Sequence, residues 1–162
     1  MPQRIGKVKA LFTTPGGLRR ALNAWPPFVA SRISVRHIAD DWRRVLVVLK
    51  KSPLSSNYFG TQFGGSMFSM VDPFFVIMLV HNLGPDYVVW DAKGEIDFLA
   101  PGLTDLQAEL IVTEGDLEAI RRAAEGGEKV LRWFSVDLRD SDGKTVARVR
   151  KEIYVRRRSQ SE

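Results

Sequence analysis

The stretch Asn57–Asn82, NYFGTQFGGSMFSMVDPFFVIMLVHN, decides how this chain folds. Its second half is apolar nearly all round, which is typical of a helix that is covered on every side. One carboxylate, Asp72, interrupts the apolar run, although a buried charge without a partner is strongly unfavourable. The pair Gly64-Gly65 lets the backbone come close to a ligand and can begin a helix. The stretch therefore predicts a central helix that carries one functional charge.

Six other segments have the apolar alternation of half-buried strands. They cover residues 31–39, 42–51, 88–100, 104–112, 129–138 and 145–155. In the first, Ile33, Val35 and His37 are expected on one face. In the third, Val88, Trp90, Ala92, Ile96 and Phe98 are expected on one face.

Turn and helix signals separate these strands. Asp142-Gly143 predicts a hairpin turn between the last two strands. A short helix is expected from Thr14 to the Pro26-Pro27 pair, with Leu18, Leu22 and Trp25 on one side. A second is expected over 115–127, with Asp116 as its N-cap and Gly126 as its C-cap.

These elements predict an α+β fold in which a curved, mostly antiparallel sheet wraps around the central helix. No repeat or long linker divides the chain. We expect an N-terminal arm and short helix over residues 1–30, a single domain over 31–156, and a basic tail over 157–162.

Composition narrows the function. The chain has 162 residues, 44% of them hydrophobic, which suits one domain with a sizeable core. There is no Cys and the two His are far apart, so we expect neither disulfides nor a metal site. The N-terminus lacks the apolar region of a secretory signal, and the run Met67–Val80 is too short to span a bilayer. These features predict a soluble, cytoplasmic protein without a membrane partner.

The net charge is +5, and much of the excess lies in the last strand and the tail. Such a patch can attract nucleic acid or a phosphate-bearing ligand. The sequence shows no aromatic–basic surface motif, so a nucleic-acid-binding module is the less favoured hypothesis and no nucleic-acid partner is expected.

The spacing within the central stretch has a consequence for assembly. N–H groups in the first turn of a helix lack partners and favour negative charge, such as a thioester carbonyl becoming an oxyanion. Asp72 lies eight residues beyond Gly64, about 12 Å along a helix. One carbonyl cannot contact both ends of that span. If Gly64 and Asp72 serve one reaction, they come from different chains of a two-fold homodimer.

The order Asn57, Gly60, Phe63-Gly64-Gly65 and Asp72 resembles the Asn…His-Gly-Gly…Asp pattern of hotdog-fold acyl-CoA thioesterases of the phenylacetyl-CoA type. The segment EIDFLAPG, residues 95–102, is similar to the next strand of that fold and its Pro-Gly exit. The resemblance extends from about Ser31 to Arg156. It is closest to a group of hotdog proteins with an N-terminal helical extension.

The resemblance implies an acyl-CoA thioesterase. Asp72 would be the general base or nucleophile, and its basicity would rise in an apolar cleft. Gly64 would donate its N–H to the oxyanion, Gly65 would shape the turn, and Asn57 would position the water or the carbonyl. Phe63 stands where the pattern has His. Coenzyme A would arrive as part of the substrate, so no separate cofactor is expected, and the assembly would be a homodimer or a dimer of dimers.

Two further sets of residues are candidates for substrate binding. Phe63 and Phe68 are candidates for the acyl group, although Phe68 is equally suited to the core. Arg148 and Arg150 share one face of the last strand with Arg156 and are candidates for the phosphates of coenzyme A. An exposed strand face kept soluble by charge explains the arginines equally well.

Alternatives remain open for the central motif. Asp72-Pro73 is also a good helix start, with Asp72 as a cap. Asn57 has the character of a turn residue. Because Phe63 replaces His, a non-catalytic protein that binds acyl-CoA or fatty acid on the same fold is the main alternative function.

Overall fold

The computed structural model describes residues 13–158. The expected N-terminal arm and most of the expected basic tail lie outside this range. The helices are α2 (Pro15–Ala24), α3 (Pro26–Ser31), a 3₁₀ turn η1 (Pro53–Ser55), α4 (Gly64–Ser69), α5 (Phe74–Leu83) and α6 (Glu114–Ala123). The strands are β1 (Ile33–Ile38), β2 (Arg44–Leu49), β3 (Tyr87–Phe98), β4 (Leu106–Ile111), β5 (Val130–Arg139) and β6 (Thr145–Arg157).

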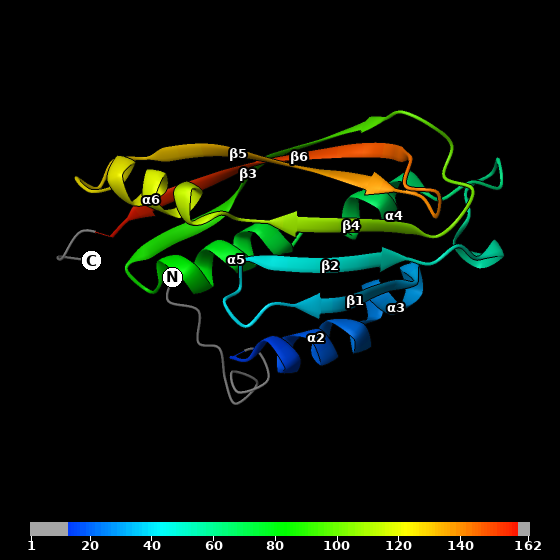
Figure 1. Cartoon of the computed structure of the whole chain (residues 1–162), viewed down its shortest axis with the longest axis horizontal. Coiled ribbons are helices and arrows are strands. Elements are labelled where there is room, and N and C mark those ends of the chain that lie inside the picture. Colours follow the sequence, from blue (N-terminus) through cyan, green and yellow to red (C-terminus); the bar gives the residue numbers. More distant parts are fainter. Residues whose placement is uncertain (1–12, 159–162) are drawn as a thin grey trace.

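The six strands form one antiparallel sheet in the order β1-β2-β4-β5-β6-β3. Helices α4 and α5 cross the inner face of this sheet, as Figure 1 shows. Strand β3 follows the central helix in sequence but pairs with β6, so β1 and β3 form the two edges. This is the α+β hotdog arrangement that the sequence predicted.

The central helix is interrupted at residues 70–73, between α4 and α5. The backbone tightens there, because Val71 N–H donates to Phe68 O at 3.0 Å and Phe74 N–H donates to Val71 O at 3.2 Å. Pro73, not Asp72, is the N-cap of α5, and no side chain caps that helix. The interpretation of Asp72 as a cap is therefore wrong. The stretch Gly64–Leu83 is apolar enough to cross a membrane, but half of it is buried as the core helix.

The N-terminal helices cover one edge of the sheet. Thr14 caps α2 by accepting a hydrogen bond from Gly17 N–H at 3.1 Å, and Leu18 and Leu22 are buried as expected. Trp25 ends α2 but remains 45% exposed. The Pro26-Pro27 pair ends α2 and also begins α3, a helix that the sequence pattern did not predict.

Two β-bulges change which side chains face the core. A bulge between Val35 and His37 exposes His37 and buries Ile38, contrary to the expected alternation. A second bulge lies between Asp91 and Lys93. It places Asp91 on the inner face with Ile96 and turns Trp90 to the outer face, where its ring stacks on Tyr154. A bulge adds one residue to a strand, so every later side chain changes face.

Helix α6 begins one residue earlier than predicted. Its N-cap is Thr113, and Asp116 is the third helical residue, which closes a reciprocal capping box with Thr113. Its C-cap is Ala124 rather than Gly126, while Gly127 takes the left-handed conformation at φ 88°. Asp116 was thus recognised as a helix-start residue but assigned to the wrong position.

Candidate active site

An open pocket of about 710 Å³ lies at the beginning of α4, and we call it the Gly64 pocket. Its walls are the loop before α4, the first turn of that helix and the chain that leaves β3. The lining is mostly apolar and aromatic: Asn57, Tyr58, Phe59, Thr61, Gln62, Phe63, Gly64, Met67, Phe98, Leu99, Ala100, Pro101 and Gly102. Three of the predicted site residues, Asn57, Phe63 and Gly64, therefore meet in one pocket.

The first turn of α4 has little room for side chains. A Cβ on Gly64 would lie 2.8 Å from Cζ of Phe98, and one on Gly65 would collide with the ring of Phe63. Phe63 is the N-cap of α4 and makes no side-chain hydrogen bond to the helix. The first N–H groups of the helix have no intrahelical partners. The two glycines thus keep this stretch of backbone close to the pocket.

Asn57 holds the loop that precedes α4. Its Oδ1 accepts hydrogen bonds from the N–H groups of Phe59 at 3.0 Å and Thr61 at 3.1 Å. Its Nδ2 donates to Thr61 Oγ1 at 2.8 Å and to Gln62 O at 3.5 Å. Both ends of the amide are therefore engaged inside the loop. This geometry fits the interpretation of Asn57 as a turn residue.

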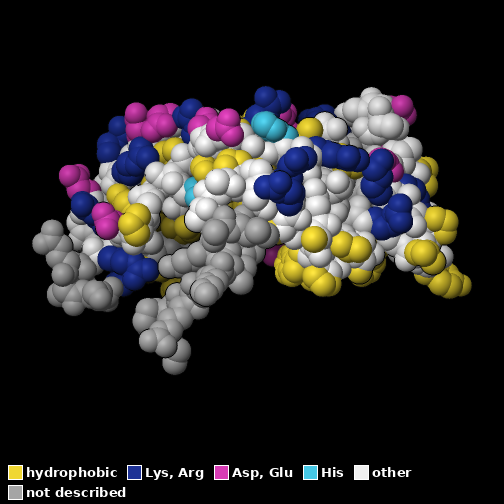
Figure 2. Space-filling model, turned by 90° about the horizontal axis from the view of Figure 1, so that it is seen from below, with side chains coloured by type: hydrophobic (Ala, Val, Ile, Leu, Met, Phe, Trp, Pro, Cys, Tyr) yellow, Lys and Arg dark blue, Asp and Glu magenta, His cyan; other side chains and the backbone are white. Residues whose placement is uncertain are grey.

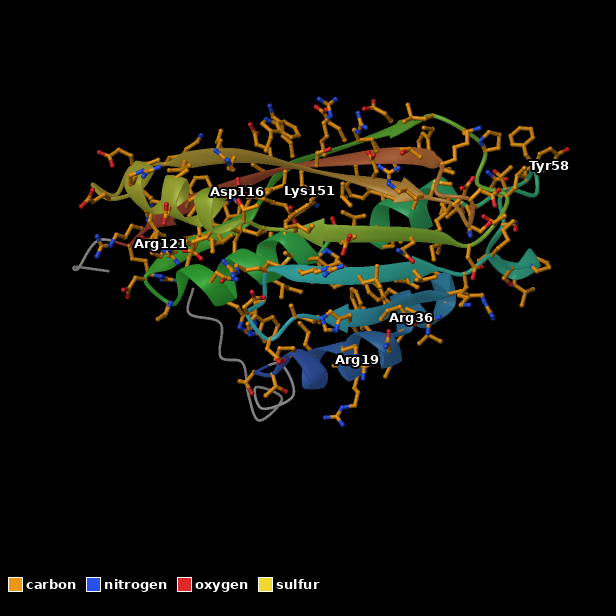
Figure 3. The ribbon with its side chains drawn as sticks, viewed as in Figure 1. Arg19, Arg36, Tyr58, Asp116, Arg121 and Lys151 are labelled. Atoms are coloured by element: carbon orange, nitrogen blue, oxygen red, sulfur yellow. The ribbon has the colours of Figure 1, made fainter. Side chains whose placement is uncertain are left out.

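The loop that Asn57 holds presents apolar side chains to the solvent. Leu54, Tyr58 and Phe59 are 95%, 97% and 83% exposed. Lys51 stabilises the loop, because its ammonium donates hydrogen bonds to Gly60 O at 2.7 Å and to Ser56 Oγ. Figure 2 shows hydrophobic side chains gathered at this end of the molecule, and Figure 3 places Tyr58 at its tip.

Asp72 does not line the Gly64 pocket. Its Oδ1 lies 2.6 Å from Nζ of Lys151 on β6, and its side chain is 51% exposed. The sequence led us to expect an apolar cleft around this carboxylate. The chain instead gives it a cationic partner 79 positions later.

Lys151 is the centre of a cluster that sequence reasoning missed. Its ammonium also lies 3.0 Å from Oδ1 of Asp91 and 5.0 Å from the centroid of the Phe68 ring, while its side chain is only 3% exposed. We call Lys151, Asp72, Asp91 and Phe68 the Lys151 cluster. Figure 3 places Lys151 in the middle of the sheet, away from Tyr58. The signal was present in β6, where Lys151 alternates with Ala147, Val149 and Ile153 at inward positions.

Electrostatics in the cluster are set by burial and by the ammonium. Burial raises the pKa of the Asp91 carboxyl above its ordinary value. The hydrogen bond and the charge of Lys151 oppose this effect, and the negative charge of Asp72 adds to it. The cluster carries one positive and two negative groups, so its net charge with both carboxylates ionised is −1.

The other predicted substrate residues lie outside the Gly64 pocket. Phe68 is half-buried against the core and faces Lys151. Arg148 binds Asp137 through Nε at 2.7 Å, and Arg150 binds Glu95 at 2.7 Å. These two arginines lie on the outer face of the sheet, opposite Asp97 and Glu95 in the β3–β6 register. Their role with coenzyme A stays a prediction.

Gln62 is a second residue that the sequence analysis did not identify. It is 1% exposed, and its Nε2 donates to Thr104 O at 3.0 Å and Leu49 O at 3.3 Å. Its backbone N–H donates to Gly102 O at 2.8 Å. Gln62 therefore fixes the wall of the pocket to the sheet. Within residues 13–158 there is no group of three or more His, Asp or Glu side chains arranged for a metal ion.

Residues 18–155 match the family model described as a domain of unknown function, DUF4442. No curated protein matches the chain.

Solved structures with the same fold include several thioesterases. A Pseudomonas aeruginosa protein described as a probable thioesterase has a TM-score of 0.73 at 17% identity, covering 86% of this chain and 93% of that one. A thioesterase of Haemophilus influenzae has a TM-score of 0.63 at 12% identity, covering 88% and 90%. The PaaI protein of the Escherichia coli phenylacetic acid degradation operon has a TM-score of 0.56 at 16% identity, covering 88% and 91%. At these identities the similarity establishes the hotdog fold.

Proposed function

This chain belongs to the DUF4442 family, and from its hotdog fold and its site we propose that it is an acyl-CoA thioesterase. The observation that carries the proposal is the Gly64 pocket, in which an apolar, aromatic lining opens onto the first turn of α4. An acyl group suits the lining, and a developing oxyanion suits the free N–H groups. Coenzyme A would be part of the substrate, and the enzyme would work in the cytoplasm.

The reaction assigns separate roles to the backbone and the carboxylate. The Gly64 N–H would donate to the thioester oxygen as it gains negative charge. Asp72 would take a proton from water, and the resulting hydroxide would add to the carbonyl carbon. Collapse of the tetrahedral intermediate would release the thiolate, which recovers the proton from Asp72. The products are a carboxylic acid and a thiol.

The two halves of this site would come from different subunits. Within one chain Gly64 lies against Phe98, whereas Asp72 binds Lys151, which is opposite Gly94. Gly94 and Phe98 are four residues apart along β3, which corresponds to about 13 Å. A single thioester carbonyl is too small to reach across that distance, so the partner's Asp72 would have to complete the pocket.

Strand β3 offers the surface for such a dimer. It is 12 residues long, forms one edge of the sheet and is mostly exposed. A long free edge is a template for pairing with a second copy. To bring the partner's Asp72 beside Gly64, position 94 of one β3 must lie opposite position 98 of the other, so the two-fold axis must pass near Ile96.

The alternative function, a non-catalytic binder of acyl-CoA or fatty acid, is favoured by two observations. Phe63 stands where the pattern of phenylacetyl-CoA-type thioesterases has His, and the amide of Asn57 is engaged in its own loop. Such a protein would use the same pocket without turnover.

Thiol release from a panel of short, long and aryl acyl-CoAs tests the proposal, with wild type, Asp72→Asn and Asp142→Asn compared. Asp142 is exposed in the β5–β6 turn and serves as the matched control. We expect turnover that falls at least about 100-fold in Asp72→Asn alone. Equal rates in all three proteins would remove Asp72 from the reaction. Binding of acyl-CoA without turnover by wild type would favour the binder.

Subunit complementation tests the shared site. Gly64→Ala pushes a methyl group against Phe98 and is expected to impair the oxyanion half of the site. Mixing it with Asp72→Asn should restore activity, because a heterodimer then has one site with neither defect. A mixture that stays as inactive as its components, although co-purification through a tag on one variant shows heterodimers, would contradict the shared arrangement.

A further inference from the structure

Three features of the β3–β6 strand pair assemble the Lys151 cluster. Lys151 occupies an inward position of β6, among apolar neighbours. Gly94 stands opposite it, and a Cβ there would lie 2.5 Å from Cζ of Phe68 and 3.4 Å from Cδ of Lys151. The β3 bulge turns Asp91 inward to meet the ammonium. Strand, glycine and bulge together hold one cation against two carboxylates.

Stability alone does not account for this arrangement. Desolvating an ammonium and carboxylates costs about as much as their attraction returns, and an apolar side chain of similar size is often as stabilising. Lys151 is 3% exposed, so it carries the full desolvation cost, whereas Asp72 and Asp91 stay partly exposed at 51% and 35%. Solvent therefore reaches the two carboxylates, whereas the ammonium between them is buried.

We propose that Lys151 and Asp91 are positioning residues for hydrolysis at Asp72; the inference rests on the thioesterase function proposed above. Lys151 holds Oδ1 of Asp72 at 2.6 Å and so fixes the position of that oxygen. Within residues 13–158 no other hydrogen bond holds the Asp72 side chain. Oδ2 is then the oxygen directed at the attacking water, with Oδ1 kept in place.

Asp91 has a separate task, which is to balance charge during turnover. When Oδ2 takes a proton from water, Asp72 becomes neutral and hydroxide adds to the thioester carbon. Lys151 would then be a buried cation without a counter-charge, which is strongly unfavourable. Asp91, 3.0 Å from the same ammonium, keeps it paired through this step. When the departing thiolate takes the proton back, the cluster returns to its starting charge.

Three variants separate this role from a structural one. Lys151→Met keeps most of the side-chain volume and removes the charge. Asp91→Asn keeps the shape and removes the second counter-charge. Lys129→Met is the control, because Lys129 is exposed directly before β5, outside the Lys151 cluster and the free edge of β3.

For each variant kcat and KM for the best acyl-CoA are measured, with the urea midpoint and the oligomeric state as checks on folding. We expect kcat to fall about 100-fold in Lys151→Met and at least about tenfold in Asp91→Asn, with KM little changed. Lys129→Met should resemble wild type. Wild-type kcat in a folded Lys151→Met protein would overturn the proposal.

Chemical rescue keeps the test decisive if stability also changes. Lys151→Ala removes the atoms of one n-propylammonium ion, so that ion should raise kcat in a saturable manner, and neutral 1-propanol should not. Equal effects of the two additives would show a packing role and overturn the proposal. A different result, no turnover of any thioester by wild type, would refute the proposed thioesterase function. A wild type that turns over and depends on Asp72 but not on Lys151 refutes only this inference.

Discussion

Gly94 lies directly opposite Lys151 across the β3–β6 pair, and its missing side chain leaves the space that the Phe68 ring occupies. Glycine in a strand interior is normally unfavourable and often marks a close approach of another group. Here that group is the ring which covers the buried ammonium.

Gly94→Ala is expected to destabilise the protein by about 1–3 kcal/mol, because the new methyl group overlaps Phe68. Urea unfolding measures the change. Gly16→Ala is the control, since a Cβ at Gly16 meets nothing within 4 Å and should leave stability nearly unchanged. Equal effects at both positions would mean that the space beside Gly94 is not needed.

Asn23→Ala should loosen the covered edge of the sheet. Asn23 accepts from Val35 N–H at 2.7 Å and donates to Val35 O at 3.0 Å, so it pairs with β1 as a neighbouring strand would. Removing it leaves two backbone groups of a buried residue unpaired, at a cost of about 1–3 kcal/mol. Hydrogen exchange at Val35 should accelerate. Exposed Arg20→Ala on the same helix provides the comparison, and unchanged protection in Asn23→Ala would refute the contact.

The Asp137–Arg148 pair should make stability depend on pH in the acid range. The hydrogen bond from Arg148 holds the pKa of the Asp137 carboxyl below its ordinary value of 3.8. The folded state therefore binds this proton less readily than the unfolded state. The contribution of the Asp137 carboxylate to folding stability is fully present above pH 3.8. It is lost as the pH falls through the lowered pKa of Asp137 in the folded protein. The difference in unfolding free energy between wild type and Asp137→Asn should shrink on acidification, and a difference that grows would have the wrong sign.

Phe63→His restores the residue that the thioesterase pattern has at this position. Phe63 is 54% exposed beside Gly64, so the change should be tolerated. We expect kcat for acyl-CoA to rise by about tenfold or more, because a polar ring can orient water or the carbonyl. Phe59→His adds the same ring elsewhere on the pocket wall and should not raise kcat. A similar response to both substitutions would deny any special role to the Phe63 position.

Arg150→Ala tests the predicted contact with coenzyme A. If Arg150 binds a phosphate, the substitution should raise KM for acyl-CoA about tenfold and leave KM unchanged for the acyl N-acetylcysteamine thioester, which has no phosphates. The same comparison applies to Arg148→Ala. Parallel changes for both substrates would assign these arginines to the carboxylates that they contact in the outer face of the sheet.

Local patterns determined much of the fold in advance. The apolar run after Gly64-Gly65 predicted the central helix, and period-two alternation predicted the six strands, because both follow from the burial of neighbouring side chains along one element. Three of the predicted site residues, Asn57, Phe63 and Gly64, line one pocket, while their roles in a reaction stay predictions. The break between α4 and α5 followed from Pro73, which cannot continue an undisturbed helix.

Tertiary structure alone decided the surroundings of Asp72. Lys151 is 79 positions away, and only the pairing of β6 with β3 brings it under the central helix. The bulge that turns Asp91 inward has no local sequence signal, since one inserted residue is placed wherever packing on both faces is best. The amide of Asn57 is likewise engaged by the loop geometry. Sequence thus determined which side chains are apolar and where the chain turns, while long-range packing determined which charges meet.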